Sequence, residues 1–378
     1  MSALEETIAL LAEMTAHPTV SDRGNRDLVD LLAVRLRADG ARVRVLPDQG
    51  GDKANLLASF GPEADGGLLL SGHLDVVPPG AGWSSDPFRL RRAGGRLFGR
   101  GSCDMKGFVA ACVTMAPKLA ARGDPVHLAL THDEEVGCLG AQALAAVMAT
   151  QGPRPAMAII GEPTEMRIIE GHKGCCEYTA RFTGLEGHGS NPDRGVNAAA
   201  YAVKYVSRLL ELAEDLKRRV PRESRFDPPW TTVNIGRIAG GVAHNVIPGK
   251  AEVDWEMRPV QYGDAEFVKE ALQQYIEEEL LPAMRAVSPQ ADISTQVIGE
   301  VVGLEPMDVN MARTLIASLT GCETADVVPF GTEAGLFQQM GMSVVVCGPG
   351  SIAQAHKPDE FVALDQLTAC LDLLDRLI

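Results

Sequence analysis

Short apolar runs in this chain repeatedly end on a histidine or an acidic residue. In an open α/β sheet, ligands bind where the backbones of neighbouring parallel strands diverge at their carboxyl ends. We therefore interpret these runs as strands that bring their terminal side chains to one site. The four runs and the residues that follow are 68–72 with His73, 126–131 with Glu134 and Glu135, 158–161 with Glu162, and 344–347 with His356.

Apolar residues at three- and four-residue spacing alternate with these runs up to about residue 174. This spacing predicts amphipathic helices at 28–38, 105–121 and 141–150. Helices that alternate with strands are typical of βαβ units around a mostly parallel sheet. The first part of the chain is therefore expected to be an α/β domain.

The pattern changes between residues 175 and 298, where the predicted order of strands and helices is β-α-β-β-α-β. This order is that of a ferredoxin-like unit. A helix at 309–319 then resumes the first pattern. We expect a discontinuous α/β domain of residues 1–174 and 299–378 with an inserted ferredoxin-like domain of residues 175–298. The elements predicted in the insertion are strand 177–182, helix 197–218, strands 231–238 and 250–257, helix 264–286 and strand 292–298.

Charge and hydropathy exclude several classes of function. The formal net charge of −15 disfavours binding to nucleic acid or to an anionic membrane, because both would repel the protein. It would favour a cationic small substrate, although an acidic surface that keeps the protein soluble is the simpler reason for the charge. No apolar run approaches the roughly 20 residues that span a bilayer. The N-terminal residues are acidic where a secretory signal is basic, so we expect a cytoplasmic protein whose cysteines are buried free thiols.

Five residues form the candidate metal site: His73, Asp104, Glu135, Glu162 and His356. Imidazole and carboxylate together suit Zn²⁺, with Co²⁺ or Mn²⁺ as possible substitutes. Five ligands exceed the needs of one tetrahedral ion, but they can hold two ions if one carboxylate bridges them.

Two neighbouring acidic residues have candidate roles in catalysis. Glu134 would be free to act as a general base beside the ligand Glu135. Asp75, two residues after His73, is placed to hydrogen-bond that imidazole and to fix its tautomer. Any single histidine or acid at a strand end is more often a capping group. The site hypothesis therefore depends on the convergence of all these residues.

The glycine-rich stretch 99–103 immediately precedes Asp104. Such a stretch can bind a dinucleotide, but Asp104 stands where the third glycine would be, and no Gly-Lys-Ser/Thr follows. We therefore exclude nucleotide binding. Three further histidines have no partner that the pattern identifies and are expected to be structural: His17, His127 and His132.

Segments 71–78 (Ser-Gly-His-Leu-Asp-Val-Val-Pro) and 99–107 (Gly-Arg-Gly-Ser-Cys-Asp-Met-Lys-Gly) resemble the co-catalytic zinc deacylases and aminopeptidase-like hydrolases. That family includes acetylornithine deacetylases, succinyl-diaminopimelate desuccinylases, aminoacylases and glutamate carboxypeptidases. The resemblance covers nearly the whole chain. Desuccinylases typically have Thr-Ser-Asp-Gly where this chain has Thr-Glu-Ala-Gly. The segments that look most like acetylornithine deacetylases are 161–164, 171–174, 331–335 and 348–356.

The resemblance implies a site with two zinc ions bridged by Asp104. It also implies that Glu134 deprotonates the bridging water. The remaining ligands would complete one ion each: His73 with Glu162, and Glu135 with His356.

In this family the inserted domain is a lid that forms a homodimer and supplies a histidine to the partner's site. His188 matches that histidine, although most relatives follow it with Ser-Ser where this chain has Gly-Ser. For Arg258, a structural ion pair within the lid is the alternative. The resemblance gives four candidates for binding the substrate's α-carboxylate: Asn245, Arg258, Gly331 and Thr332.

The reaction that this resemblance predicts is hydrolysis of an N-acyl amino acid, above all N²-acetyl-L-ornithine to L-ornithine and acetate in arginine biosynthesis. The alternatives are succinyl-diaminopimelate, another N-acyl amino acid or a dipeptide as substrate. An inactive homologue that only binds amino acids is a further alternative. The side-chain specificity stays open because the sequence does not reveal which lid residues face the substrate.

Overall fold

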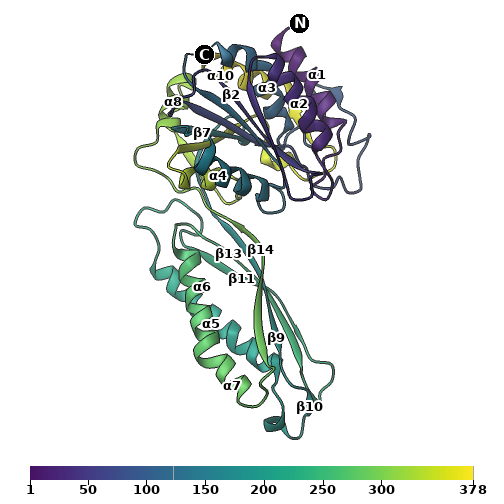
Figure 1. Cartoon of the computed structure of the whole chain (residues 1–378), viewed down its shortest axis with the longest axis vertical. Helices are drawn as coiled ribbons and strands as arrows, with labels where there is room; N and C mark the ends of the chain where they lie inside the picture. The colour runs from purple at the N-terminus through teal and green to yellow at the C-terminus, as the bar shows by residue number, and fades with distance from the viewer. Residues whose placement is uncertain (122, 378) are drawn as a thin grey trace. The chain divides into compact units, whose positions relative to one another are not determined.

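The computed structural model describes residues 1–121 and 123–377, and the chain divides into two compact units (Figure 1). The predicted boundaries are 174/175 and 298/299, whereas the main segment of unit 2 runs from His172 to Glu305. The reason is that His172 and Leu304 exchange main-chain hydrogen bonds of 3.0 Å, which extends unit 2 at both crossings. Unit 1 contains Met1–Gly171, Pro306–Val327 and Thr332–Ile378, and unit 2 contains His172–Glu305 and Val328–Gly331.

Unit 1 is built around an eight-stranded mixed sheet. Strands β6, β3, β7 and β16 are mutually parallel, and β3 and β6 are buried throughout, as continuous apolar runs predict. Strands β2 and β8 run antiparallel to these four, and each follows a short turn that reverses the direction of the chain after β1 or β7. In sheet order the strands are β1 (Arg42–Pro47), β2 (Ala54–Phe60), β6 (Val126–Thr131), β3 (Leu68–His73), β7 (Met157–Pro163), β16 (Ser343–Gly348), β8 (Ile168–His172) and β15 (Ala325–Val328).

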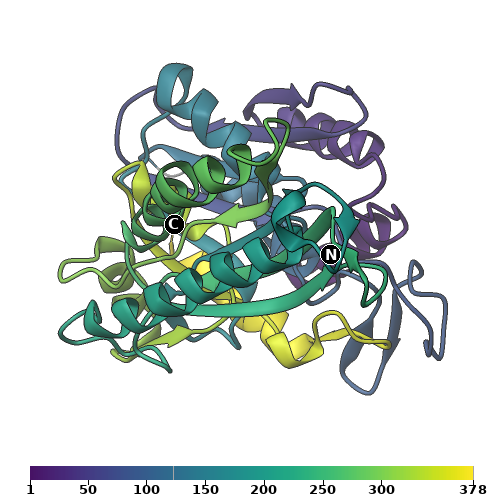
Figure 2. The ribbon, with the colours of Figure 1, turned by 90° about the horizontal axis from the view of Figure 1, so that it is seen from below.

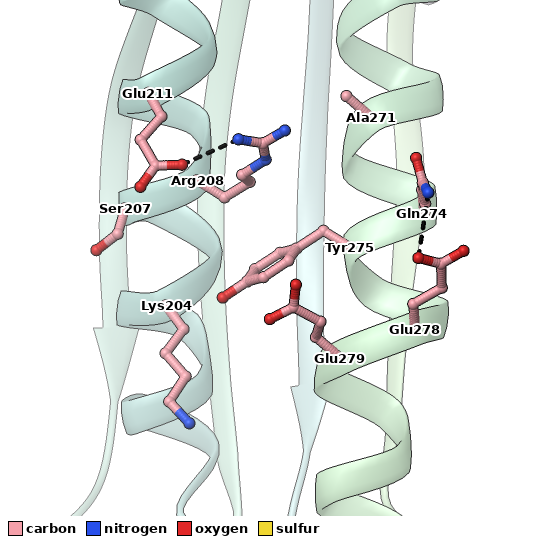
Figure 3. A pocket seen from close by; sticks show the side chains of 9 residues that line it. All are labelled: Lys204, Ser207, Arg208, Glu211, Ala271, Gln274, Tyr275, Glu278 and Glu279. Carbon is pink, nitrogen blue, oxygen red and sulfur yellow. Dashed lines mark hydrogen bonds and ion pairs between the residues drawn. The ribbon is translucent and has the colours of Figure 1, made fainter.

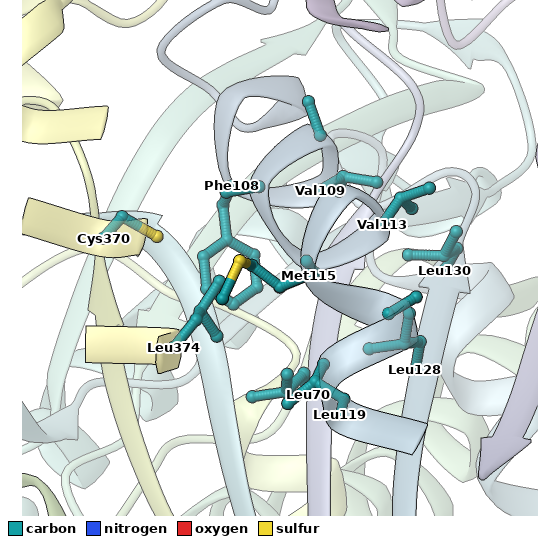
Figure 4. Packing of buried hydrophobic residues seen from close by; sticks show 14 of the residues in the cluster. Leu70, Phe108, Val109, Val113, Met115, Leu119, Leu128, Leu130, Cys370 and Leu374 are labelled. Atoms are coloured by element: carbon teal, nitrogen blue, oxygen red, sulfur yellow. The ribbon is translucent and has the colours of Figure 1, made fainter. Parts of the chain in front are cut away.

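The core of unit 1 lies between this sheet and its helices. Phe108 and Val113 of helix α3 are buried together with Leu128 of β6 and Leu374 of α10 (Figure 4). A small sheet is formed by β4 (Arg91–Ala93), β5 (Arg96–Phe98) and β17 (Phe361–Ala363). The helices are α1 (Ala3–Thr15), α2 (Arg26–Ala38), α3 (Lys106–Ala120), α4 (Leu139–Gln151), α8 (Met311–Thr320), α9 (Ala334–Gln339) and α10 (Leu364–Arg376).

Unit 2 has the ferredoxin-like order of elements, with an antiparallel sheet in the order β11-β13-β9-β14. Helices α5 and α6 lie on the same side of this sheet (Figures 1 and 2). Buried residues of strand β13 alternate with residues that are mostly half-buried, because only one face meets the helices. The elements are β9 (Cys175–Thr183), β10 (Gly187–His188), α5 (Ala198–Arg218), β11 (Thr232–Gly240), β12 (Val246–Ile247), β13 (Lys250–Arg258), α6 (Asp264–Tyr275), α7 (Leu281–Arg285) and β14 (Asp292–Val301).

The predicted helix 264–286 is interrupted in the structure. A π-helical turn at Ile276–Leu280 separates α6 from α7. Pro282 follows this turn, and its ring nitrogen has no hydrogen to donate to the helix. The interruption is therefore consistent with the position of the proline.

None of the helices within residues 1–121 and 123–377 has the length and apolar character needed to span a bilayer. All eight cysteines are free thiols, but Cys175 and Cys322 are half-buried and not fully buried as expected, because both lie near the surface.

Candidate metal centre and active site

Two groups of potential metal ligands share one residue, Asp104. Within each group, the ligand atoms lie within 4.8 Å of one another. Asp104 is the residue that the family resemblance places between two ions. The groups are His73, Asp104 and Glu162, and Asp104, Glu135 and His356.

The two oxygens of Asp104 face different histidines. Nε2 of His73 lies 3.0 Å from Oδ1, and Nε2 of His356 lies 3.3 Å from Oδ2. Glu162 is 3.7 Å from the first imidazole nitrogen, and Glu135 is 3.0 Å from the second. With metal–ligand bonds near 2.1 Å, the ligands of a tetrahedral zinc ion lie about 3.4 Å apart. The distances between the side chains therefore fit two ions with a shared carboxylate.

The fold brings these ligands to one edge of the sheet. His73 ends β3, Glu162 lies near the end of β7, and Asp104 stands just before α3. Glu135 follows β6, which is parallel to β3. His356 lies in the loop after β16 with a φ of 62°, a left-handed conformation that is uncommon for residues other than glycine. The candidate ligands thus lie together at the carboxyl edge of the central parallel strands.

Charge in the cluster favours cations. Burial raises the pKa of Glu162 well above its usual value, and the neighbouring carboxylate of Asp104 raises it further. Burial acts to lower the pKa of His73, but its hydrogen bond to Asp104 and the charge of Glu162 raise it well above its usual value. Hydrogen bonds to Asp104 and Glu135 raise the pKa of His356 to about 10. A divalent cation would relieve the same repulsion between carboxylates that these protons relieve.

Glu134 belongs to neither group of ligands, although it is adjacent to Glu135. Its side chain is half-buried, and the thiol of Cys138 donates to its Oε1 at 3.5 Å. Burial raises the pKa of Glu134 to about 8, with a further contribution from the charges of Glu135 and Asp104. A carboxylate that binds a proton near neutral pH is suited to proton transfer.

Asp75 contacts His73 through its main chain. The Nδ1 atom of His73 lies 2.9 Å from the main-chain oxygen of Asp75 and 3.6 Å from the nearer carboxylate oxygen. A hydrogen on Nδ1 leaves Nε2 free to bind a metal. The carboxylate instead accepts hydrogen bonds from the Ser21 hydroxyl and from the main chain of Glu134 and Glu135.

Two buried carboxylates at the site were not predicted. Glu360 accepts hydrogen bonds from the loop that presents Asp104. Glu333 accepts hydrogen bonds from the hydroxyls of Ser71 and Thr131, which belong to strands β3 and β6. Neither acid follows an apolar strand. Glu333 could have been identified from the sequence, because it lies in the segment 331–335 that carried the family resemblance.

The predicted histidine of unit 2, His188, is exposed on β10. Its Nδ1 accepts a hydrogen bond from the main-chain N–H of Ser190 at 3.2 Å and lies 2.7 Å from the Ser190 hydroxyl. Accepting at Nδ1 leaves the hydrogen of a neutral imidazole on Nε2. A Cβ atom on Gly189 would lie 3.0 Å from the main-chain carbon of Asn245, which explains a glycine after the histidine.

The four candidates for binding the substrate's carboxylate are in different environments. Asn245 is exposed in unit 2, and Gly331 is half-buried there. Arg258 pairs with Glu256 through Nη2 at 2.7 Å and Nε at 3.1 Å. Thr332 is buried in unit 1, and its hydroxyl accepts the N–H of Ala334. Arg258 and Thr332 therefore both have partners within the chain.

A pocket of about 540 Å³ lies between helices α5 and α6 and contains none of the candidate site residues (Figure 3). Charged side chains of both signs line it, and Arg208 and Glu211 form an ion pair of 3.0 Å there. The candidate metal ligands therefore lie outside this pocket. The lining residues are Lys204, Ser207, Arg208, Glu211, Ala271, Gln274, Tyr275, Glu278 and Glu279.

Comparison with known families agrees with this geometry. The sequence model of peptidase family M20/M25/M40 matches residues 69–378. The chain belongs to this family. A protein from Myxococcus xanthus named acetylornithine deacetylase is 38% identical over 98% of this chain and 96% of its own length. An acetylornithine deacetylase from Pasteurella multocida is 35% identical over 100% of this chain and 98% of its own length.

Solved structures of M20 proteins have the same fold. A metallo-carboxypeptidase of the M20 family from Sulfolobus solfataricus superposes with a TM-score of 0.74 at 18% identity, covering 98% of both chains. A Bacillus subtilis protein described as a dinuclear metal binding peptidase from the M20 family gives a TM-score of 0.64 at 16% identity. That match covers 100% of this chain and 97% of the other.

Proposed function

We propose that this member of family M20/M25/M40 is a metal-dependent amidohydrolase that converts N²-acetyl-L-ornithine to L-ornithine and acetate. The reaction would be a step of arginine biosynthesis. One observation carries the choice of substrate: four relatives named acetylornithine deacetylase are 35% to 38% identical to the chain over 98% to 100% of its length.

The site would hold two zinc ions, with Co²⁺ or Mn²⁺ as substitutes. Asp104 would contact both ions, and its 3.0 Å and 3.3 Å separations from two different histidines support this arrangement. When bound, such ions supply Lewis acidity that lowers the pKa of water to about 7 and polarises the acyl carbonyl. The remaining ligands would be His73 and Glu162 for one ion, and Glu135 and His356 for the other.

Glu134 would transfer the proton in this reaction. As the water oxygen attacks the acyl carbon, the carboxylate of Glu134 accepts the water proton. It then donates the proton to the amide nitrogen as the carbon–nitrogen bond breaks. The second water proton also passes to the amine, which gives acetate and ornithine with a protonated amino group. Burial raises the pKa of Glu134 above the usual value of a carboxyl group, which supports a role in proton transfer.

His188 would donate a hydrogen bond from Nε2 to the tetrahedral oxyanion, from the partner subunit of a homodimer. Its Nδ1 contact with Ser190 supports a hydrogen on Nε2. Arg258 would bind the substrate's α-carboxylate by exchanging its pairing with Glu256, with the help of Asn245 and the Gly331–Thr332 main chain.

A comparison of kcat/KM for acetylornithine, succinyl-diaminopimelate, acetylmethionine, acetylcitrulline and a dipeptide tests the proposal, with zinc-loaded protein. We expect acetylornithine to have the highest value. A higher kcat/KM for another compound would change the proposed substrate but not the proposed reaction class. The absence of turnover for every compound with both ions bound would contradict the proposed hydrolase activity.

The homodimer and the cytoplasmic location stay predictions. Light scattering on the purified protein would measure the first, and fractionation of cells that express the full chain would measure the second.

A further inference from the structure

The carboxylate of Glu360, which is 1% exposed, holds one loop of unit 1 through four hydrogen bonds. Its Oε1 accepts the main-chain N–H groups of Cys103 at 2.9 Å and Asp104 at 3.1 Å. Its Oε2 accepts the N–H of Gly101 at 2.9 Å and the guanidinium of Arg100 at 2.7 Å. Glu360 therefore contacts nearly every residue that leads into Asp104.

The partner of Glu360 in this loop is itself fixed. Arg100 is 1% exposed, and its Nη2 donates to the carbonyls of Pro78 at 3.4 Å and Pro79 at 3.3 Å. Its guanidinium also lies over the ring of Trp83, 5.2 Å from the centroid. A buried arginine held on several sides gives Glu360 a fixed cation to pair with.

The main chain of Glu360 reinforces the same connection. Its carbonyl oxygen accepts the N–H of Gly99 at 3.0 Å. The next residue, Phe361, pairs with Phe98 where strands β17 and β5 meet. The segment of Glu360 is thus joined to the glycine-rich loop through both its main chain and its side chain.

This segment also carries a candidate ligand. His356 precedes Glu360 by four residues, and its Nε2 lies 3.3 Å from Oδ2 of Asp104. One short segment therefore presents a ligand of the second group and holds the loop of the ligand that both groups share.

We infer that Glu360 is a positioning residue for Asp104. It fixes the main chain at Asp104 so that the two side-chain oxygens face His73 and His356 separately. The inference rests on the proposed function, because the ions that Asp104 would bridge are those proposed above.

The chemistry of the contacts makes Glu360 difficult to replace. Its two oxygens accept three main-chain N–H groups and one guanidinium N–H, and none of these donors can accept a bond in return. In Glu360→Gln, one oxygen becomes an NH₂ group that faces donors. Two of the four bonds are lost and the loop must shift.

The test uses the full-length protein stripped of metal and titrated with Zn²⁺ against a chromophoric chelator. We expect Glu360→Gln to weaken binding of at least one ion by roughly 10- to 100-fold. The visible spectrum of the Co²⁺-loaded variant should differ from that of wild type, because the ligand geometry changes. With zinc at saturation, kcat for acetylornithine should fall while KM stays within about twofold of wild type.

Glu170→Gln is the matched control. Glu170 is also buried in unit 1 and pairs with an arginine, Arg313, at 2.6 Å, but it does not belong to either group of ligands. This variant loses a comparable ion pair and should keep the metal affinity and the Co²⁺ spectrum of wild type. Equal losses in both variants would attribute the effect to general destabilisation and would overturn the inference.

The remaining outcomes separate this inference from the proposed function. Wild type that binds fewer than two zinc ions would contradict the two-ion site itself. Wild type that binds two ions, with Glu360→Gln identical in affinity and spectrum, would overturn the positioning role alone. If circular dichroism shows that Glu360→Gln does not fold, the same zinc titration is carried out on Arg100→Lys. We expect Arg100→Lys to bind zinc more weakly than wild type, and unchanged binding would overturn the inference.

Discussion

The carboxylate of Asp75 holds the main chain of Glu134: its Oδ1 accepts the Glu134 N–H at 3.1 Å. The other oxygen accepts the Ser21 hydroxyl at 2.7 Å and lies 3.4 Å from the nitrogen of Glu135. Asp75 follows strand β3, whereas the two glutamates follow β6. One carboxylate therefore holds the turn that carries two adjacent glutamates, for which different roles are proposed.

The first prediction separates those tasks. Glu134→Gln keeps the size of the side chain but cannot accept a proton, so kcat should fall by roughly 10²–10⁴ while zinc is retained. Glu135→Gln removes a charged ligand near His356 and should lose zinc instead. Elemental analysis of both variants beside their kcat values makes the comparison. Zinc lost from Glu134→Gln and kept by Glu135→Gln would exchange the two roles.

The second prediction concerns the shared ligand. Because each oxygen of Asp104 faces a different histidine, Asp104→Ala should lose both ions. Glu162 belongs to only one of the two groups of ligands. Glu162→Ala should therefore bind one ion more tightly than the other. Equilibrium dialysis followed by elemental analysis gives the number of ions per chain. A variant of Asp104 that still binds two ions with wild-type affinity would rule out the bridging role.

The main elements of the fold were predictable because burial leaves a pattern in the sequence. Strands β3 and β6 are buried on both faces, so each is a continuous apolar run that stands out from its neighbours. Strand β15 is short and largely half-exposed, and it has no such pattern. The antiparallel direction of β8 depends on the turn after β7, which hydropathy does not encode.

The candidate site was likewise predictable only where the sequence carries a pattern. His73 and Glu162 were identified because they end apolar strands. The task of Glu360 could not be predicted, because it depends on which main-chain N–H groups face its carboxylate, and those groups are common to all residues except proline. The main-chain contact between Asp75 and His73 was unpredictable for the same reason.

The third prediction concerns recognition of the substrate's carboxylate. Arg258→Ala should raise KM for acetylornithine by the equivalent of about 1.5–3 kcal/mol, the range for a lost charge-assisted hydrogen bond. The methyl ester of the substrate lacks the carboxylate charge, so its KM should hardly differ between wild type and Arg258→Ala. Glu256→Gln is the control, since it frees the guanidinium and should not raise KM. Equal losses for acid and ester would assign Arg258 to the structural ion pair with Glu256.

The fourth prediction is a dependence of stability on pH. His127 is 2% exposed, and burial lowers its pKa to about 4, with a smaller contribution from Arg42. The unfolded chain binds this proton below about pH 6.5, whereas the folded chain binds it only near pH 4. Stability should therefore fall as the pH decreases from 6.5 to 4, by up to about 1.4 kcal/mol per pH unit from this side chain.

Urea denaturation of wild type and His127→Asn at pH 8 and pH 5 measures this effect. The variant should be the less stable protein at pH 8, and the difference should shrink at pH 5. Leu128→Ala is the control, because it removes a buried neighbour that does not titrate. A difference between wild type and His127→Asn that is the same at both pH values would contradict the prediction.

The last prediction tests whether each active site is shared between two chains. His188 belongs to unit 2 and Glu134 to unit 1, and the family resemblance assigns the histidine to the partner's site. Dimers are usually two-fold symmetric, so a residue that reaches the partner does so in both directions. The homodimers of Glu134→Ala and of His188→Ala should each be nearly inactive.

In a mixed dimer, the chain with His188→Ala keeps its own Glu134 and receives an intact His188 from the other chain. One complete site is restored, and the second site lacks both groups. Statistical exchange makes about half of the dimers mixed, so co-refolding equal amounts should recover about a quarter of wild-type activity. Native mass spectrometry would establish that mixed dimers are present. Activity no greater than the sum of the two variants would then place His188 in the site of its own chain or outside the chemistry.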